Sequence, residues 1–354
     1  MNQTDVDHDS LELYDFQLPR ELIAQHPVEH RIDARLMLID RKTGNIDHRY
    51  VRDLPELIHP GDALVLNDSM VIPARLTGVR TSTGGRWEGL FLRDGTDGVW
   101  EILSKTRGSL TVGETISLRD RDGREQPMLT VLARLDDGHL AVRTVDGSSR
   151  QEVLERYGRV PLPPYIRDGQ MVDRDKETYQ TVYAKHPGSV AAPTAGLHFT
   201  ADLIRQLKSR GTLTVPVTLH VGLGTFRPVS GKRLSEHKMH YEWCELSEAS
   251  AERLRTSRES GGRVIAVGTT SVRVLEGTAH STGKPFQPWA GMTDIFIRPP
   301  YEFSSVDALM TNFHLPKSTL IALVSAFASR DLIMHAYNVA VEQRYRFYSY
   351  GDCM

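Results

Sequence analysis

The second half of the chain alternates between helical and strand-like spacing of its apolar residues. Leu203, Ile204 and Leu207 form one apolar stripe at helical spacing. Thr200 is a suitable N-cap before the stripe and Gly211 a suitable stop after it, which predicts a helix over 201–210. The same signals predict further helices over 247–260, 318–327 and 333–345, a helix that opens over 270–276, and strands over 212–221 and 263–267. Pro216 lies inside the strand at 212–221 and predicts an edge or a bulge there.

A different pattern occupies the region from about residue 75 to residue 145. Short β-prone runs begin at Arg86, Val99, Met128 and His139, and Gly-Gly or Asp-Gly pairs separate them. No stretch in this region keeps a helical period beyond two turns. The pattern predicts a small antiparallel barrel or sandwich of about six strands.

The first seventy residues are mixed, with strands predicted over 36–40 and 63–66. The simplest architecture is therefore a mixed α/β fold: one discontinuous α/β catalytic domain, residues 1–74 and 156–354, with an antiparallel β-barrel domain, residues 75–155, inserted into it. We find no internal repeat and no low-complexity segment.

Composition narrows the class of protein. The chain has 354 residues, and its 43 Lys and Arg against 45 Asp and Glu give a formal net charge of −2, so it lacks the positive excess common in nucleic-acid-binding proteins. Its two cysteines, Cys244 and Cys353, form no CxxC motif and indicate neither a zinc ribbon nor a disulfide framework. The N-terminus has no signal-peptide pattern, and the most apolar segment, 320–328, is about half the length that spans a bilayer. We expect a cytoplasmic protein with no membrane partner.

The common nucleotide-binding signatures are missing. Gly222-Leu223-Gly224 follows a predicted strand, but Pro228 comes too soon for a helix to start and the third glycine is absent. The chain contains neither GxxxxGK[ST] nor GxSxG. A better candidate is Val267-Gly268-Thr269-Thr270-Ser271, a strand that ends in glycine before hydroxyl side chains that open a helix. Such a turn suits a carboxylate or phosphate, although a simple N-cap explains it equally well.

Histidines are concentrated in the α/β part. His186, His198, His220, His237 and His240 lie within 55 residues, and His314 follows later. His237 and His240 have the spacing of metal ligands on a helix, but no clean third ligand is near them, so a metal site is not expected. Single histidines are more often structural than catalytic. Small residues beside His198, His220 and His314 at the ends of elements instead indicate a pocket where a ligand approaches backbone.

These same stretches carry a resemblance to a known family. The segment 188–199, GSVAAPTAGLHF, resembles a segment of the S-adenosylmethionine:tRNA ribosyltransferase-isomerases of the queuosine pathway. So do TLHVGLGTFRPV at 218–229, HKMHYE at 237–242, RVIAVGTTSVRVLE at 263–276 and MTNFHLPKSTL at 310–320, and the matches follow in order along almost the whole chain. One departure is Met70, which stands where the family usually has a basic residue.

The resemblance implies a reaction and a set of catalytic candidates. The ribosyl part of S-adenosylmethionine is transferred to the 7-aminomethyl-7-deazaguanine base at the wobble position of tRNA and isomerised to an epoxycyclopentane, and adenine and methionine are released. No metal or redox cofactor is required, because S-adenosylmethionine is a consumed substrate. A base near pH 7 can remove a C5′ hydrogen that the sulfonium acidifies, and adenine needs a proton donor to leave. The candidates for this acid–base work are His198, His220, His240, Glu242 and His314.

The candidates for substrate binding lie in the same motifs. They are Thr194, Ala195, Gly196, Phe199, Gly222, Gly224, Thr225, Phe226, Thr269, Thr270, Ser271, Arg273, Asn312 and Phe313. We expect the methionine carboxylate at Thr269–Ser271, with Arg273 on the following turn. The three phenylalanines are candidates to stack on adenine or the deazaguanine, and core packing is the equally weighted alternative.

Two other classes of protein compete with this interpretation. A non-catalytic RNA-binding protein would grip RNA with the barrel, but the clustered histidines and glycine turns lie outside the barrel. An ordinary methyltransferase would need a glycine-rich loop after its first strand, which the N-terminal segment lacks. On a nearly neutral protein, contacts to a tRNA anticodon loop must come from local basic clusters. The candidates are Arg75, Arg80 and Arg86, or Lys105 and Arg107, or Lys232, Arg233 and Lys238.

Overall fold

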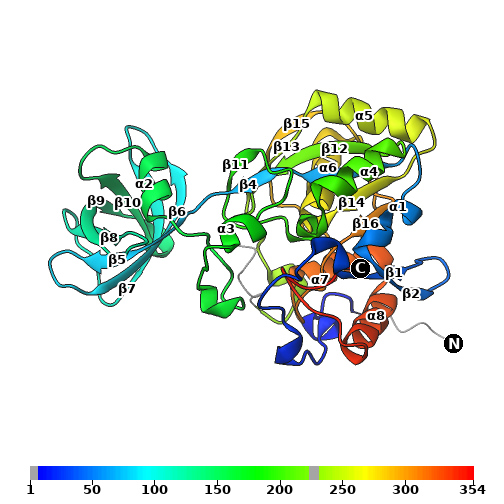
Figure 1. Cartoon of the computed structure of the whole chain (residues 1–354), viewed down its shortest axis with the longest axis horizontal. Coiled ribbons are helices and arrows are strands. Elements are labelled where there is room, and N and C mark those ends of the chain that lie inside the picture. The colour runs from blue at the N-terminus through cyan, green and yellow to red at the C-terminus, as the bar shows by residue number, and fades with distance from the viewer. Residues whose placement is uncertain (1–6, 223–230) are drawn as a thin grey trace. The chain divides into compact units, whose positions relative to one another are not determined.

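The computed structural model describes residues 7–222 and 231–354. The chain divides into two compact units, one formed by residues 1–70 and 177–354 and the other by residues 71–176 (Figure 1). The second unit contains the whole span 75–155 that the sequence assigns to an inserted barrel. The predicted fold class, a mixed α/β part with an antiparallel β-barrel, is confirmed.

A six-stranded mixed sheet forms the centre of the α/β unit. Its order is β15 (Trp289–Thr293), β13 (Glu242–Leu246), β12 (Leu213–Leu219), β3 (Ala63–Asn67), β14 (Val264–Val267) and β16 (Ala308–Met310). The last four strands run parallel to one another, whereas β13 is antiparallel to both β12 and β15. The parallel strands are nearly continuous apolar runs, as expected where both faces of a sheet are covered.

Alternate residues of these strands feed two separate hydrophobic cores. In β3, Ala63 and Val65 belong to one core, which also contains buried side chains of α5 (Glu248–Glu259), α6 (Gly268–Thr282), α7 (Thr319–Ala328) and α8 (Arg330–Glu342). Leu64 and Leu66 belong to the other core, with α1 (Leu54–Leu57), α4 (Ala201–Ser209) and the hairpin strand β1 (Arg35–Ile39). The two-residue period of the strand therefore sends neighbouring side chains to opposite faces, and helices cover both (Figure 1).

Local capping explains why several predicted helices begin and end where expected. The Thr200 hydroxyl accepts a hydrogen bond from the Leu203 N–H at 3.1 Å, and α4 ends before Gly211, whose φ is +91°. Ser247 and Ser318 cap α5 and α7 in the same way. The helices at 201–210, 247–260 and 318–327 are confirmed within one or two residues. The helix expected to open at residue 270 begins two residues earlier, at Gly268.

The expectation for Pro216 needs a correction. β12 is an inner strand of the sheet and not an edge strand. However, β13 pairs with β12 only at Thr218 and Leu219, whereas Pro216 pairs with Leu66 of β3 on the other side. Pro216 has no N–H to donate. It lies in the part of β12 that does not pair with β13, so the missing donor is tolerated there.

The second unit is a closed antiparallel barrel in the order β10-β7-β6-β5-β8-β9. Its strands are β5 (Arg75–Arg80), β6 (Arg86–Asp94), β7 (Trp100–Thr106), β8 (Thr115–Arg119), β9 (Glu125–Arg134) and β10 (His139–Thr144). Strict alternation of buried and partly exposed residues in β5 and in most of β6 gives the barrel an apolar interior. Helix α2 (Arg150–Tyr157) follows β10 and begins with a capping box formed by Ser149 and Glu152. The closed barrel settles the choice between barrel and sandwich.

Short elements complete the described chain. β2 (Ile46–Tyr50) pairs with β1, and β4 (Ser69–Val71) pairs with β11 (His186–Ser189). The remaining short α-helix is α3 (Asp175–Thr178), and the short 3-10 helices include η7 (Thr194–His198) and η9 (Leu234–Glu236). The others are Leu11–Tyr14, Arg20–Leu22, Arg31–Asp33, Val51–Asp53, Asp136–Gly138 and Arg167–Gly169.

One ion pair secures the start of the central strands and gives a testable stability effect. The buried Asp62 carboxylate accepts from the Arg263 guanidinium at 2.6 Å and from the backbone N–H groups of His59 and Arg263. Burial alone would raise the pKa of Asp62, but these hydrogen bonds outweigh it and hold the pKa below its usual value. The ionised form therefore stabilises the fold at neutral pH, and this contribution is lost as the pH falls below about 4.

Asp62→Asn is accordingly expected to lower the free energy of unfolding by about 1–2 kcal/mol at pH 7, because it removes the charge partner of Arg263, whose 40% exposed side chain is partly screened by solvent. Urea unfolding at pH 7 and pH 3.5 measures the effect. The difference between the variant and the wild type should shrink at the lower pH. An equal difference at both pH values would contradict the ionised pair.

Candidate active site

The candidate site lies where the parallel strands of the central sheet end. Because β12, β3, β14 and β16 run parallel, their carboxyl ends share one edge, and ligands of open α/β sheets bind at such an edge. Antiparallel β13 begins at the same place, beside the end of β12. We call this region the carboxyl edge: residues 67–69, 220–222, 268–271 and 311–312, with Glu242 and with His186, whose N–H donates to the Asp68 carbonyl.

The structure separates the predicted site residues into several groups. The carboxyl edge, with the first turns of α6, brings together His220, Gly222, Glu242, Thr269, Thr270, Ser271, Arg273 and Asn312. Thr194, Ala195, Gly196 and His198 lie on η7, and the position that a Cβ of Gly268 would take is 3.5 Å from the Ala195 side chain. His240 is exposed in the segment between η9 and β13. Gly224, Thr225 and Phe226 lie outside the described residues.

The turn from β14 into α6 has the form of an anion site. Gly268 has a φ of +85°, a conformation that favours glycine, and it lets α6 begin directly above the strand. The preceding residue, Val267, supplies no side-chain cap, so the first N–H groups of a 15-residue helix have no capping side chain. The Ser271 hydroxyl donates to the Val267 carbonyl at 2.8 Å, whereas the buried Thr270 hydroxyl finds no partner within the described chain. A simple N-cap does not account for this arrangement.

A buried cation lies one turn further along the same helix. Arg273 is 7% exposed, and its Nη1 donates to the Glu242 carboxylate. Glu242 in turn accepts from the Gly222 N–H at 2.8 Å, which fixes the ion pair to the end of β12. The Nε and Nη2 groups of Arg273 are buried and have no hydrogen-bond partner in the described part of the chain. A guanidinium remains charged in proteins. Two unpartnered N–H donor groups on the buried guanidinium of Arg273 therefore indicate a binding site for an anion.

His220 lies at the end of β12 with a restricted ring. The imidazole stacks on Trp243 with centroids 5.3 Å apart and planes 20° apart, and its Nδ1 is buried without a partner. Gly188 also lies next to the ring: its φ is +152°, and a Cβ there would be 3.0 Å from the imidazole. Burial and the neighbouring His186 lower the pKa of His220. The ring is therefore neutral at pH 7.

Gly188→Ala would push a methyl group against the His220 ring in a backbone conformation that L-residues rarely adopt. We expect it to lower catalytic turnover about tenfold with a fall in melting temperature of only a few degrees. Gly84→Ala, in an open turn of the barrel where φ is +68° and a Cβ would meet nothing within 4 Å, is a positive-φ substitution without a side-chain contact and serves as the control. Equal loss of activity in both variants would contradict a role for the ring position.

The sequence reasoning missed two residues of the carboxyl edge, Asp68 and His186. Asp68 follows β3 directly, is 7% exposed, and accepts from the Thr218 hydroxyl at 2.8 Å. His186 Nε2 lies 3.6 Å from the other carboxylate oxygen. Burial raises the pKa of Asp68, although Thr218, His186 and Lys185 oppose that effect. The position of Asp68 at the end of a buried strand was the signal that could have found it.

Asn312 joins η7 to the carboxyl edge. Its Nδ2 donates to the Tyr348 carbonyl at 3.2 Å, so its Oδ1 is the atom that accepts from the Thr194 hydroxyl at 2.9 Å. The same Nδ2 is 3.2 Å from His198 Nε2, which must therefore be the unprotonated nitrogen of a neutral ring. Burial, with the nearby charges of Arg31 and Arg346, lowers the pKa of His198 to about 4.

His314 and two of the phenylalanines are core residues in this structure. His314 Nε2 is 3.0 Å from the Thr311 hydroxyl, and burial lowers the pKa of the ring to about 3. Phe313 is fully buried, with its ring packed against Tyr337 at 5.5 Å. Phe199 is fully buried in the second core. The packing alternative fits both rings, because neither is exposed to a base.

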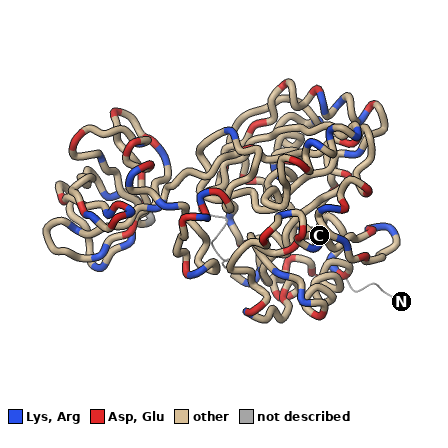
Figure 2. Tube along the Cα trace, viewed as in Figure 1, with Lys and Arg blue, Asp and Glu red and all other residues tan. Residues whose placement is uncertain are grey.

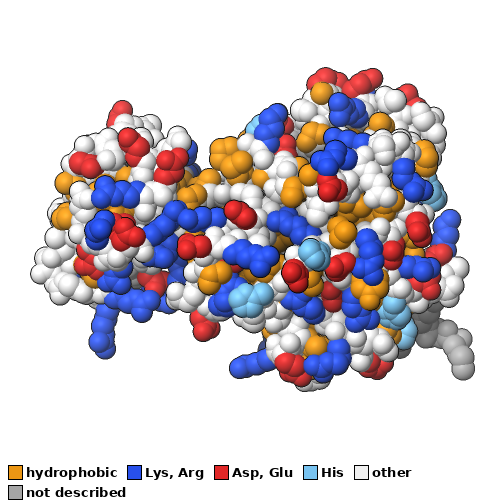
Figure 3. Space-filling model, in the orientation of Figure 1, with side chains coloured by type: hydrophobic (Ala, Val, Ile, Leu, Met, Phe, Trp, Pro, Cys, Tyr) orange, Lys and Arg blue, Asp and Glu red, His pale blue; other side chains and the backbone are white. Residues whose placement is uncertain are grey.

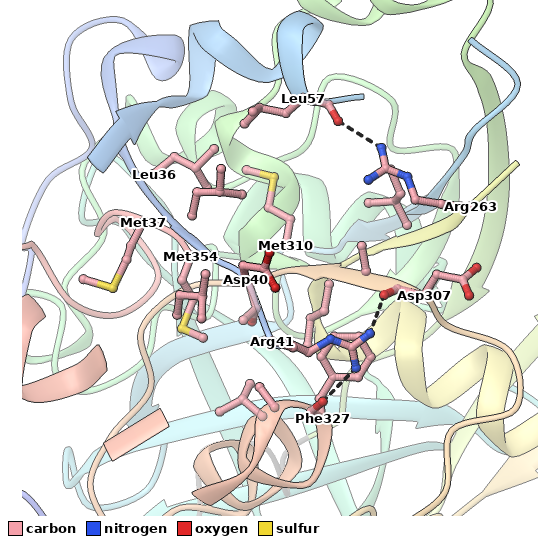
Figure 4. A pocket seen from close by; sticks show the side chains of 18 of the residues that line it. Leu36, Met37, Asp40, Arg41, Leu57, Arg263, Asp307, Met310, Phe327 and Met354 are labelled. Carbon is pink, nitrogen blue, oxygen red and sulfur yellow. Dashed lines mark hydrogen bonds between the residues drawn. The ribbon is translucent and has the colours of Figure 1, made fainter. Parts of the chain in front are cut away.

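A cavity of about 660 Å³ lies elsewhere in the α/β unit, between β1 and the edge strand β16 (Figure 4). Its lining is mostly apolar and includes Leu36, Met37, Met310 and Met354. The charged groups that reach it are engaged: Arg41 donates to the Phe327 and Asp307 carbonyls at 2.8 and 2.7 Å. None of the predicted site residues lines this cavity, and its polar groups do not converge on a common point as those of the carboxyl edge do.

Two further features bear on cofactors and location. Residues 7–222 and 231–354 contain no group of three or more His, Cys, Asp or Glu side chains arranged to hold a metal ion. Among the described helices, no single one is long and apolar enough to cross a membrane, although α7 and α8 pass the test of length and composition together across a bend of 116°. Cys244 and Cys353 are buried and free.

Comparison with known proteins shows the family to which the chain belongs. A family model described as "Queuosine biosynthesis protein" matches residues 11–354. The crystal structure of S-adenosylmethionine tRNA ribosyltransferase from Thermotoga maritima is similar at 36% sequence identity, with a TM-score of 0.55. The match covers 97% of this chain and 99% of that one.

Proposed function

Because the chain belongs to the queuosine biosynthesis protein family, we propose the site and the steps by which it acts as an S-adenosylmethionine:tRNA ribosyltransferase-isomerase. The ribosyl part of S-adenosylmethionine passes to the 7-aminomethyl-7-deazaguanine base at the wobble position of a tRNA anticodon loop. Isomerisation of the sugar gives epoxyqueuosine, and adenine and methionine are released. S-adenosylmethionine is a consumed substrate in this reaction.

The carboxyl edge supplies a binding site for the methionine part of S-adenosylmethionine. The substrate carboxylate lies at the N-terminus of α6, where the free N–H groups, the Thr270 hydroxyl and the idle donors of Arg273 meet it. Glu242 positions Arg273 through their ion pair and does not itself contact the carboxylate. The observation that carries this placement is the buried guanidinium with two unpartnered donors.

The rest of the substrate extends along the edge toward β3 and β12. Neighbouring strands lie about 4.8 Å apart, so the ends of β14 and β12 are separated by about 10 Å. That span suits a molecule the size of S-adenosylmethionine, with the methionine carboxylate at α6 and the ribose near the histidines. The sulfonium acidifies the C5′ hydrogens, and a neutral imidazole accepts one of them.

The deciding experiment follows the small products. The protein is incubated with S-adenosylmethionine labelled in the adenine and methionine parts and with tRNA that carries the aminomethyl-deazaguanine. Equal release of adenine and methionine is expected. Formation of S-adenosylhomocysteine would indicate a methyltransferase, and RNA binding without consumption of S-adenosylmethionine would indicate a non-catalytic binding protein.

The charge pattern predicts how tRNA binding responds to salt. Charges of both signs alternate along the chain (Figure 2) and over the visible face (Figure 3). Several basic candidates are already paired: Arg80 with Glu114 at 2.5 Å, Arg75 with Glu88 at 3.0 Å, and Arg233 with Asp9 at 2.8 Å. These three arginines are therefore less available for phosphates.

We therefore expect a shallow salt dependence of tRNA affinity, measured by filter binding between 50 and 200 mM salt. The slope of log K against log salt should correspond to a few neutralised phosphates. A slope that corresponds to about ten phosphates would contradict the expectation. A basic RNA-binding domain measured in the same buffers is the control.

A further inference from the structure

Asp68 and His186 meet at the carboxyl edge although they are far apart in the sequence. The backbone brings them together: the Lys185 and His186 N–H groups both donate to the Asp68 carbonyl, at 2.7 and 3.2 Å. Strand β11, which begins at His186, also pairs with β4, which begins one residue after Asp68. The two side chains are therefore held beside each other by main-chain hydrogen bonds.

The Asp68 carboxylate is buried but only partly engaged. One oxygen accepts from Thr218, and the other has His186 Nε2 at 3.6 Å, which is longer than a hydrogen bond. Catalytic hydrogen bonds are often this long before substrate binds and tighten in the complex. A buried carboxylate without a close counter-charge is costly, so a structural role alone does not account for it.

The other histidines of this region are less suited to accept a proton. His198 and His314 are buried, with Nε2 next to Asn312 and Thr311 respectively. The His220 ring stacks on Trp243 and lies close to Gly188, which restricts its movement. By contrast, the His186 side chain is 48% exposed, and its Nε2 lies beside the Asp68 carboxylate.

We propose that His186 is a catalytic base of the ribosyl transfer and that Asp68 is its positioning residue. The inference rests on the proposed function. With Nε2–H directed at Asp68, the neutral imidazole offers Nδ1 as the acceptor. The C5′–H bond of S-adenosylmethionine breaks, its electron pair stays on C5′ beside the sulfonium, and the proton moves to Nδ1. The Asp68 carboxylate then faces an imidazolium.

Several charged groups surround this pair and set its pH response. Lys185 and His186 lie on one side of Asp68, and both lower its pKa against the effect of burial. Tyr183 is close enough for the Asp68 charge to contribute to its raised pKa. His220 is also close to His186, and burial together with the charge of His186 lowers the pKa of His220.

The test compares His186→Gln and Asp68→Asn with the wild type. Adenine release gives kcat and the KM for S-adenosylmethionine, and tritium loss from C5′-labelled S-adenosylmethionine reports proton removal directly. His186→Gln should lower kcat and tritium loss together by about 100-fold, with KM within about threefold. Asp68→Asn should lower kcat at least tenfold and move the acid limb of the pH–rate profile to lower pH, because the imidazolium loses its counter-charge.

The matched control is His139→Gln in the barrel, which also alters a histidine next to a carboxylate, with His139 Nδ1 2.7 Å from Glu101. Its kcat should stay within twofold of the wild type. If the wild type releases no adenine, the proposed function itself fails. If the wild type is active and His186→Gln keeps kcat within threefold, this inference is overturned. Should His186→Gln melt at a lower temperature, the Asp68→Asn pH profile decides, and an unmoved acid limb overturns the inference.

Discussion

Replacement of Arg273 by lysine is expected to raise the KM for S-adenosylmethionine about 100-fold while the affinity for tRNA stays within about threefold. Lysine keeps a positive charge opposite Glu242, but its single ammonium cannot replace the unpartnered Nε and Nη2 donors of Arg273, which we propose bind the substrate carboxylate. A 100-fold change corresponds to about 2.7 kcal/mol, the range for one or two hydrogen bonds to a charged group.

The measurement is a steady-state KM together with S-adenosylmethionine affinity by calorimetry, which does not depend on turnover. Arg263→Lys is the matched control because Arg263 also pairs with a buried carboxylate, that of Asp62, and lies at the opposite edge of the same sheet. It should lower the melting temperature as much as Arg273→Lys does, with KM unchanged. If the KM of Arg273→Lys stays within threefold of the wild type, the substrate carboxylate does not bind at Arg273.

The sequence predicts elements whose signals are local. The helix at 201–210 was visible because its cap, its apolar stripe and its stop lie within twelve residues, and α4 matches it. The barrel was visible because Gly-Gly and Asp-Gly turns separate its strands. The three- and four-residue strands β16, β4 and β11 carry no periodicity and were missed. The prediction that Pro216 marks an edge strand was wrong. Which residues of β12 pair with β13 depends on contacts between segments that are distant in the sequence.

The same division holds for the site. The turn at Gly268 and the hydroxyls that follow it were recognisable from spacing, and the structure places Arg273 beside them. Asp68 and His186 come together only because β3 pairs with β12 and β4 with β11, and no local pattern encodes that contact. The sequence also does not show which of the histidines are buried. His198 and His314 looked equivalent to His220, yet the structure encloses both and lowers the pKa of each well below its usual value.

These two buried histidines predict a steep loss of stability in mild acid. In the folded protein the pKa is about 4 for His198 and about 3 for His314, whereas in the unfolded chain both lie near the usual value of about 6.5. Between about pH 6.5 and pH 4 the unfolded chain therefore binds more protons than the folded one. Stability is fully present above pH 6.5 and falls as the pH is lowered through that window.

From pH 7 to pH 5 each histidine is expected to lower the free energy of unfolding by about 2 kcal/mol, or about 4 kcal/mol together. Urea unfolding at half-unit pH steps measures this, and His314→Gln should remove about half of the slope. Phe313→Leu is the control, since it weakens the same core at every pH without changing the slope. This dependence begins well above the carboxylate range, so it separates the histidines from Asp62. A flat profile between pH 7 and pH 5 would mean that at least one of the two rings becomes protonated in the folded protein, which would return it to the set of acid–base candidates.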